Sequence, residues 1–231
     1  GCASTRGALY PAPTSVGYMP NFHAPRGRRA PALLAALSIG GATALMPTEA
    51  PPLLNSPVFS LSTLNADGTT NMQILTYATP VGIGPKRTWG VSLYRPTLTH
   101  ANFCKQRSGI LQVLCEPHAA IVFALGGKSG NDSDKAAACA AAGFEWIKPP
   151  ESWGGPTRSP LLLPGCSRYL RLSQVGELQP CGEHDLAICA VEDMLGLPPE
   201  DELRAVALST AHLRELGLIS DRGKAIEPAS V

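Results

Sequence analysis

Several short segments of the chain alternate apolar and polar side chains, and this pattern limits the fold more than any other feature. Residues 57–64 alternate in this way, as a half-buried strand does. They lead into Asn65-Ala-Asp-Gly68, which carries the Asp-Gly signal of a tight hairpin turn. Pro80 cannot donate to a sheet ladder, so its strand is expected at an edge or with a bend there. Further strands are expected over 71–83, 88–94, 110–115, 168–179 and 183–193, the last two paired as a hairpin.

The remaining patterns predict helices that lie outside a sheet. Thr97 or Thr99 is expected to cap the first of them. A final amphipathic helix is expected over 203–218, closed by Gly217. Short antiparallel strands with outer helices favour a small antiparallel barrel over a parallel α/β sheet. The other helices are expected over 97–107, over 118–125 and in the alanine-rich stretch that follows Lys135.

The first fifty residues differ in composition from the rest and are predicted to be a targeting segment, with the folded domain over 51–231. They hold four arginines, no lysine and one acid, Glu49, among Ala, Pro, Gly, Ser and Thr. Such acid-poor, Arg-bearing leaders are typical of organelle transit peptides. Arg28-Arg29 before the apolar run 30–46 also resembles a second, thylakoid-directed signal. We therefore expect a chloroplast protein, in the stroma or the thylakoid lumen; the alternative is a disordered, Ala-rich linker.

Charge and cysteine spacing exclude several classes of function. The formal net charge is +1, so no nucleic-acid surface is expected, and no membrane partner is expected for the folded domain. The seven cysteines form no Cys-x-x-Cys pair, and the five histidines show no metal-ligand spacing, so no metal site is expected. Gly-x-Ser-x-Gly is absent, which disfavours a serine hydrolase.

Three segments carry groups that could bind or react with a ligand. Gly126-Gly-Lys-Ser-Gly130 is suited to an anion, but Val122 stands where a triphosphate-binding loop requires its first glycine. Arg95, just before an expected helix N-terminus, would suit a phosphate monoester. His184 lies beside two acids that could fix its tautomer or raise its pKa. Each segment alone also fits an ordinary turn, a capped helix or a structural histidine.

Taken in order, these segments resemble the flavin reductase-like, FMN-binding split-barrel family of plants and cyanobacteria. The resemblance runs from about residue 58 to residue 219. It rests on Asn65-Ala-Asp-Gly-Thr-Thr-Asn71, Thr76-Tyr-Ala-Thr-Pro-Val81, Ser92-Leu-Tyr-Arg95 with Thr97 and Thr99, Leu125-Gly-Gly-Lys-Ser-Gly130 with Asp132, Asp134 and Lys135, Cys181-Gly-Glu-His184, and the stretch 208–219.

The resemblance implies a mainly β fold, an antiparallel Greek-key split β-barrel with peripheral helices, that forms a homodimer with FMN near the interface. It implies that His184 lies near the nicotinamide of NADH or NADPH, although this chain has Glu183 where many members have Asp. The residues implied to hold FMN are Thr76, Tyr77, Ala78 and Thr79 at the ring, Ser92, Leu93, Tyr94, Arg95, Thr97 and Thr99 along the ribityl chain and phosphate, and Lys128 and Ser129 closing over it.

The function that the resemblance implies is an NAD(P)H-dependent flavin oxidoreductase that transfers hydride from nicotinamide to FMN. The main alternative is an FMN-binding electron-relay or non-catalytic flavoprotein without nicotinamide turnover. A structural subunit that has lost the cofactor is disfavoured, because Arg95, Lys128 and the threonines are present. No dinucleotide fingerprint distinguishes NADH from NADPH.

Overall fold

The computed structural model describes residues 52–202 and 205–227. The predicted targeting segment therefore lies outside the described residues, and its role and the domain boundary stay predictions. Among the residues described, no helix is both long and apolar enough to cross a membrane.

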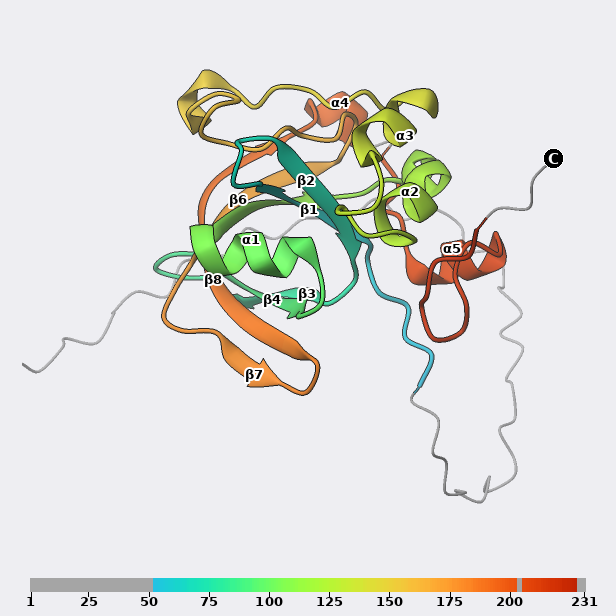
Figure 1. Cartoon of the computed structure of the whole chain (residues 1–231), viewed down its shortest axis with the longest axis horizontal. Helices are drawn as coiled ribbons and strands as arrows, with labels where there is room; N and C mark the ends of the chain where they lie inside the picture. Colours follow the sequence, from blue (N-terminus) through green and yellow to red (C-terminus); the bar gives the residue numbers. More distant parts are fainter. Residues whose placement is uncertain (1–51, 203–204, 228–231) are drawn as a thin grey trace, which may run out of the picture. The chain divides into compact units, whose positions relative to one another are not determined.

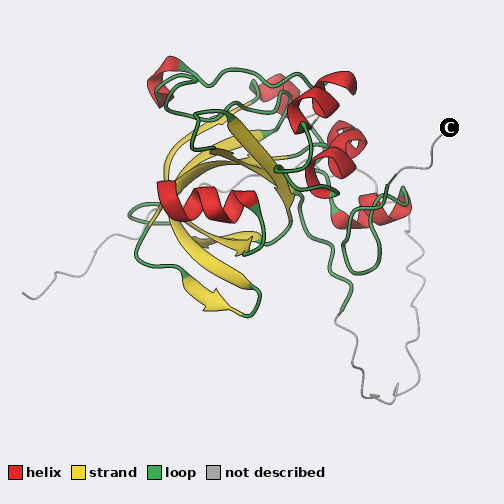
Figure 2. Ribbon diagram, viewed as in Figure 1, coloured by secondary structure: helices red, strands yellow, loops and turns green. Residues whose placement is uncertain are grey.

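Eight antiparallel strands form one strongly curved sheet, which confirms the antiparallel split-barrel prediction (Figures 1 and 2). The order across the sheet is β2-β1-β5-β6-β8-β4-β3, and β7 pairs with β8 alone. β1 to β5 and β8 to β4 are neighbours that are distant in sequence, so the sheet is not a simple meander. The strands are β1 (Phe59–Leu64), β2 (Thr70–Leu75), β3 (Ala78–Gly82), β4 (Thr88–Tyr94), β5 (Ser108–Val113), β6 (Arg168–Gln174), β7 (Gln179–Cys181) and β8 (His184–Gly196).

The prediction of one strand over 71–83 was wrong, because this segment supplies both edges of the sheet. β2 pairs with β1 at one edge, and β3 pairs with β4 at the other. The break falls at Thr76 and Tyr77, where the Tyr77 carbonyl accepts a hydrogen bond of 2.9 Å from the Ser92 N–H and so turns the chain toward β4. Pro80 lies in the edge strand β3, as predicted.

The predicted hairpin between 168–179 and 183–193 is present only in part. The turn at Gly182 joins β7 to β8, and the Gly182 φ of +62° suits glycine. β6 ends at Gln174 and pairs instead with the distal half of β8, across a bulge between Arg171 and Leu172. Because β8 is 13 residues long, one strand can serve β4, β6 and β7 as a partner.

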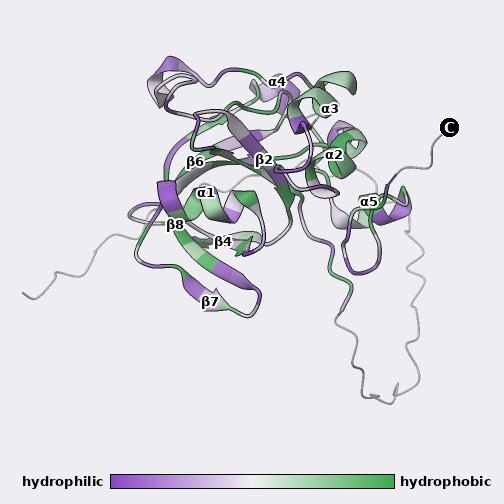
Figure 3. Cartoon of the chain, in the orientation of Figure 1, coloured by the Kyte–Doolittle hydropathy of each residue, from purple (hydrophilic) through white to green (hydrophobic). Residues whose placement is uncertain are grey.

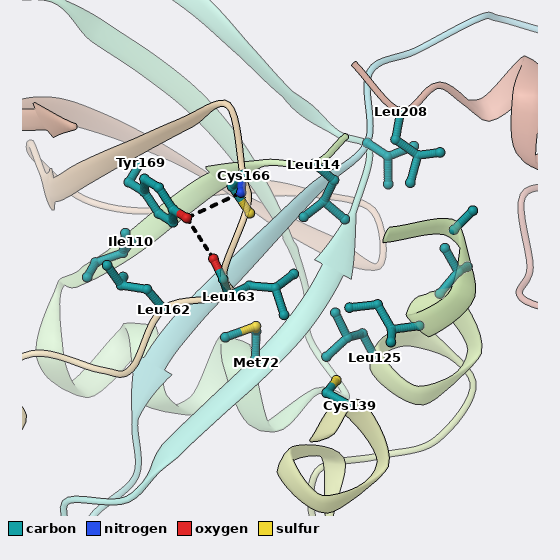
Figure 4. Packing of buried hydrophobic residues seen from close by; sticks show 14 of the residues in the cluster. Met72, Ile110, Leu114, Leu125, Cys139, Leu162, Leu163, Cys166, Tyr169 and Leu208 are labelled. Carbon is teal, nitrogen blue, oxygen red and sulfur yellow. Dashed lines mark hydrogen bonds between the residues drawn. The ribbon is translucent and has the colours of Figure 1, made fainter. Parts of the chain in front are cut away.

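Two apolar clusters lie on opposite faces of the sheet. The inner cluster fills the barrel with residues such as Phe59, Leu61 and Leu111. The outer cluster lies under the helices, where the Tyr169 hydroxyl donates to the Leu163 carbonyl at 2.8 Å and accepts from the Cys166 N–H at 3.2 Å (Figure 4). The alternating strands thus bury both faces.

The first helix, α1 (Leu98–Gln106), confirms the prediction over 97–107 and contacts both β2 and β4. Thr97 is its N-cap and accepts from the His100 N–H at 3.2 Å. Phe103 enters the inner cluster from this helix and is fully buried. In Figure 1, α1 lies between the β1–β2 pair on one side and the β3–β4 pair on the other.

The helices over the outer cluster follow the predicted order. The expected helix over 118–125 is a 3₁₀ turn, Glu116–Ile121, continued by α2 (Val122–Gly126). The alanine-rich segment forms α3 (Lys135–Ala141), and Asp134 caps it by accepting from the Ala137 N–H. α2 is among the most hydrophobic helices in Figure 3 and packs against β2 and α3. A further 3₁₀ turn lies at Glu151–Trp153.

The predicted helix over 203–218 is much shorter in the structure. The described part of this stretch holds only α5 (Thr210–Glu215), and a separate turn, α4 (Pro199–Glu202), precedes it. Residues before α5 bond as a strand does: the Leu208 carbonyl accepts from the Val58 N–H, and the Leu208 N–H donates to the Leu114 carbonyl. Backbone pairing here overrides helical periodicity. Gly217, at φ +69°, ends α5 as expected.

Candidate functional site

A cleft of about 250 Å³ lies between the N-terminus of α1, strand β2 and the glycine loop after α2. We call it the α1 cleft. Five residues predicted from sequence meet there although they come from distant segments: Tyr94, Thr97, Thr99, Lys128 and Ser129. The fold therefore places the helix N-terminus opposite the glycine loop, an arrangement that suits an anion.

A buried hydrogen-bond network holds α1 against the β1–β2 hairpin. The Asn71 side-chain amide donates to Thr99 Oγ1 at 2.8 Å, and the Asn102 amide donates to Asn65 Oδ1 at 2.8 Å. Asn71 and Thr99 are only 4% and 3% exposed, and both line the α1 cleft. Since Thr99 accepts from Asn71, its own hydroxyl proton remains available to a ligand.

The glycines of this loop lie too close to neighbouring atoms to be replaced by larger residues. A Cβ at Gly127 would come within 2.3 Å of the Phe123 ring, and one at Gly130 within 2.3 Å of Asn71 Oδ1. The loop is therefore fixed close to both α2 and β2. Lys128 is exposed, with its ammonium 5.8 Å from the centre of the Phe123 ring.

Lys135 is a buried cation beside this loop. It is 7% exposed and lines the α1 cleft. Its ammonium donates to the Leu125 carbonyl at 2.8 Å and to the Met72 carbonyl at 3.1 Å. No carboxylate in the described part of the chain forms a salt bridge with it. Burial lowers the pKa of Lys135 to about 8, so an anion in the cleft would satisfy an otherwise uncompensated charge.

A second hollow, of about 420 Å³, contains the other predicted segment. We call it the β3 hollow, and it is lined by the consecutive residues Thr76, Tyr77, Ala78 and Thr79 together with Ser92. A smaller hollow of about 180 Å³ shares Gln73 with the α1 cleft and Thr76 with the β3 hollow. The three therefore follow one another along β2 and the break after it.

His184 lies between two tyrosines at the start of β8. Its ring centre is 5.1 Å from that of Tyr94 and 5.8 Å from that of Tyr77. Tyr94 lines the α1 cleft and Tyr77 the β3 hollow, so His184 lies beside the route between them. Tyr77 is 65% exposed, which leaves an aromatic face open to a second ring.

Asp185 fixes two basic groups at this end of the site. One carboxylate oxygen accepts from Arg95 Nη2 at 2.8 Å and Nε at 3.1 Å, and the other lies 2.8 Å from His100 Nε2. The hydrogen bonds from Arg95, and then those from His100, hold the pKa of Asp185 at about 2. Arg95 is thus held by β8 and does not line the α1 cleft.

Most of the residues that the sequence predicts as ligand-binding line the α1 cleft or the β3 hollow, but not all of them do. Leu93, a predicted ligand-binding residue, is buried in the inner cluster and lines neither the α1 cleft nor the β3 hollow. Asn71 and Lys135 were noted only as parts of motifs, and Asp185 only as a neighbour of His184. Their roles come from contacts between residues far apart in sequence. A lysine directly before an alanine-rich helix is the one local signal that singles out Lys135.

Two further kinds of side chain bear on the chemistry of the site, metal-ligating groups and thiols. Over 52–202 and 205–227, no three His, Cys, Asp or Glu side chains gather as a metal site. Cys104 Sγ lies 3.5 Å from His100 Nε2, but partial desolvation of this exposed residue raises the pKa of its thiol. Cys104 is therefore a poor nucleophile.

A family model described as "Flavin reductase like domain" matches residues 53–216. Among solved structures, flavoredoxin from Methanosarcina acetivorans is similar, with a TM-score of 0.58 and 15% identity over 73% of this chain and 88% of that chain. The NADH:FAD oxidoreductase of Streptomyces globisporus C-1027 gives a TM-score of 0.53 at 12% identity, over 68% of this chain and 81% of that one. An FMN-binding protein from Thermus thermophilus gives 0.53 at 17%, over 68% and 81%. No curated protein matches the chain.

Proposed function

The chain belongs to the flavin reductase-like domain family, and from this premise we propose that it binds FMN and catalyses its reduction by NADH or NADPH. The observation that carries the proposal is the row of hollows along β2, with a buried ammonium at one end and an open aromatic surface at the other. This row matches a ligand that has a phosphate at one end and a flat ring at the other.

The α1 cleft fits the phosphate. Lys135 supplies a fixed positive charge and Thr99 a hydroxyl, while Lys128 and Ser129 lie on the glycine loop opposite. Backbone N–H groups of the loop and of the first turn of α1 add dipoles of the same sign. An anion there would offset the cost of burying the Lys135 charge.

The β3 hollow fits the ring system. β3 is an edge strand, and edge strands present backbone N–H and C=O groups without sheet partners. These groups can bond the polar edge of an isoalloxazine, as predicted for residues 76–79. When bound, FMN supplies the hydride-accepting ring, and the protein supplies position and electrostatics.

Tyr77, Tyr94 and His184 would form the surface against which the nicotinamide is positioned. Holding two rings in contact is the main requirement for hydride transfer, and it needs no general base. Asp185 positions His100 and Arg95 beside this surface and stays ionised at neutral pH because of its low pKa.

We also propose a homodimer that covers the β3 edge. Val81 and Ile83 are 54% and 91% exposed on or just after this strand. Exposed apolar side chains on an unpaired edge are typical of an association surface. Location in a chloroplast likewise stays a proposal, based on the composition of the first fifty residues.

An anaerobic absorbance titration of the FMN-loaded protein with NADH and then NADPH tests the reductase proposal. We expect rapid bleaching of the oxidised flavin band by at least one donor, and the faster donor is the preferred one. A bound flavin whose band does not bleach would show an electron-relay or storage protein instead. If added FMN does not bind, the site assignment itself is wrong.

His184→Ala is expected to slow flavin reduction by NAD(P)H about 10-fold or more, because it removes one wall of the surface that positions the nicotinamide. FMN affinity should stay nearly unchanged, since His184 lines neither the α1 cleft nor the β3 hollow. Stopped-flow reduction and a fluorescence titration with FMN measure the two effects separately. His212→Ala, at a position on helix α5 that lines none of the three hollows, is the control. Equal reduction rates in both variants would remove His184 from the mechanism.

A further inference from the structure

A hollow of about 200 Å³ is lined by residues of β5, β6 and β8 and by Gln106 at the end of α1. We call it the arginine hollow, because Arg158 and Arg171 both line it. It shares no lining residue with the α1 cleft, with the β3 hollow or with the smaller hollow that adjoins both. The proposed flavin site therefore does not account for these two arginines.

The two guanidinium groups have N–H donors that are not used by carboxylates of the described residues. Arg171 Nε is buried and has no hydrogen-bond partner there, and neither Arg171 nor Arg158 forms a salt bridge within the described part of the chain. Arg95 and Arg168, which lie outside the hollow, each pair with a carboxylate. A planar guanidinium matches the two oxygens of a carboxylate, or those of a phosphate. The hollow therefore suits an anion.

The carboxylates nearest Arg171 are already bonded to other groups. Glu192 lines the hollow and accepts from Lys86 Nζ at 2.5 Å, which lowers the pKa of Glu192. Asp193 lies opposite Arg171 in the sheet register and accepts from Trp153 Nε1 at 2.7 Å, which lowers the pKa of Asp193. Both carboxyl groups are thus ionised at neutral pH. The two arginines and Lys86 still outnumber them, so an anion would neutralise the positive charge that remains.

The loop that carries Arg158 is held in place before any ligand binds. Trp153 is 2% exposed, and its bond to Asp193 ties the loop to β8. The Ser159 hydroxyl donates to the Trp153 carbonyl and so closes the loop. At Gly154, where φ is +94°, a Cβ would lie 2.9 Å from Arg158 Cβ, so the chain folds tightly back on this arginine. Such preorganisation lowers the entropy cost of binding a small ligand.

The volume and the lining of the arginine hollow indicate the class of anion. The volume lies below the range of about 300–1,000 Å³ that is usual for ligand pockets, so the ligand is small. Ser108 supplies a hydroxyl, and Leu64 and Pro160 supply apolar surface that an organic acid can contact and inorganic phosphate cannot. We propose that the arginine hollow binds a small organic acid through its carboxylate, at a site separate from that of the flavin.

Titration calorimetry of the FMN-saturated protein with malonate, acetate and inorganic phosphate, at constant ionic strength, tests this proposal. FMN is included so that the α1 cleft, the other proposed anion site, is filled. We expect malonate or acetate to bind, and Arg158→Gln and Arg171→Gln each to weaken this binding about tenfold or more, because each removes a charged donor to the carboxylate. Arg222→Gln removes an exposed arginine that does not line the hollow and should leave the affinity unchanged.

Arg158 is exposed, so Arg158→Gln should fold even if Arg171→Gln does not. Equal malonate and acetate affinities in Arg158→Gln and Arg222→Gln would overturn the inference, as would a failure of the unmodified protein to bind either acid. Binding of phosphate alone, lost in Arg158→Gln, would show a phosphate site and would overturn the assignment to an organic acid. If the protein does not bind FMN, the proposed function fails, but the same three variants still test the arginine hollow.

Discussion

Replacing Lys135 by methionine is expected to weaken FMN binding about 10- to 100-fold, since a hydrogen bond to a charged group is worth about 1.5–3 kcal/mol. Riboflavin lacks the phosphate, so its affinity should change far less. The comparison matters because Lys135 also bonds the Leu125 and Met72 carbonyls, and losing those bonds will destabilise the fold somewhat. A purely structural role would weaken both flavins alike. Isothermal titration with FMN and riboflavin distinguishes the two.

Lys128→Met is the matched control, because Lys128 lies on the same cleft but its side chain is exposed. Exposed charges contribute little, so we expect a loss of about threefold at most. The pH dependence is a second readout. With a pKa of about 8, against an ordinary 10.5, Lys135 in the free protein loses its charge as the pH rises through 8. FMN affinity should therefore fall above that pH, and this fall should be absent from Lys135→Met.

The lowered pKa of Lys135 also makes the free energy of unfolding depend on pH. The pKa is lower in the folded than in the unfolded chain, so the unfolded chain binds more protons between about pH 8 and 10.5. The Lys135 contribution to stability therefore improves as the pH rises through this window. Cys139, the thiol whose charge would act on Lys135, has a pKa raised by burial and is neutral around neutral pH. Buried FMN phosphate would reverse the shift by stabilising the ammonium.

Phe103→Ala is expected to lower the free energy of unfolding by about 3–5 kcal/mol, the usual cost of removing a buried aromatic side chain. Phe103 is fully buried in the inner cluster and joins α1 to the barrel. Because α1 carries Thr97 and Thr99, FMN affinity should fall as well. Urea unfolding measures the first effect and a flavin titration the second.

Cys104→Ala is the control for this change, one position further along the same helix. Cys104 is exposed, and substitutions at such positions usually change stability by less than about 0.5 kcal/mol. An equal loss of stability in both variants would mean that the helix, and not the packing of the Phe103 ring, is what was disturbed.

The alternating pattern located the strands well where each strand has one regular pair of neighbours. β4 coincides with its predicted range, because Thr88–Tyr94 alternates over its whole length. The pattern failed in segments whose secondary structure is determined by the strand with which their backbone pairs. Nothing in 71–83 indicates that its first half bonds β1 and its second half β4. Likewise, the residues before α5 have helical periodicity but bond Val58 and Leu114.

The candidate site likewise has features that follow from local sequence and features that depend on contacts between distant segments. Short motifs with special chemistry, such as the Gly126–Gly130 loop and Thr97, could be found from sequence because their function depends on local backbone geometry. Lys135 and Asp185 could not, because their roles depend on burial and on partners far along the chain. Whether a lysine is exposed or buried without a carboxylate is decided only by how α2, α3 and β2 pack.

The two-residue link between the edge strands sets a mechanical limit on the barrel. Three peptide units join Leu75 at the end of β2 to Ala78 at the start of β3, so their Cα atoms can never be more than about 11 Å apart. At this end of the break, a link of only two residues joins the two edge strands. Ligand entry there cannot depend on the edges swinging apart, and the width available to a flat ring is set by covalent connectivity before any side chain packs.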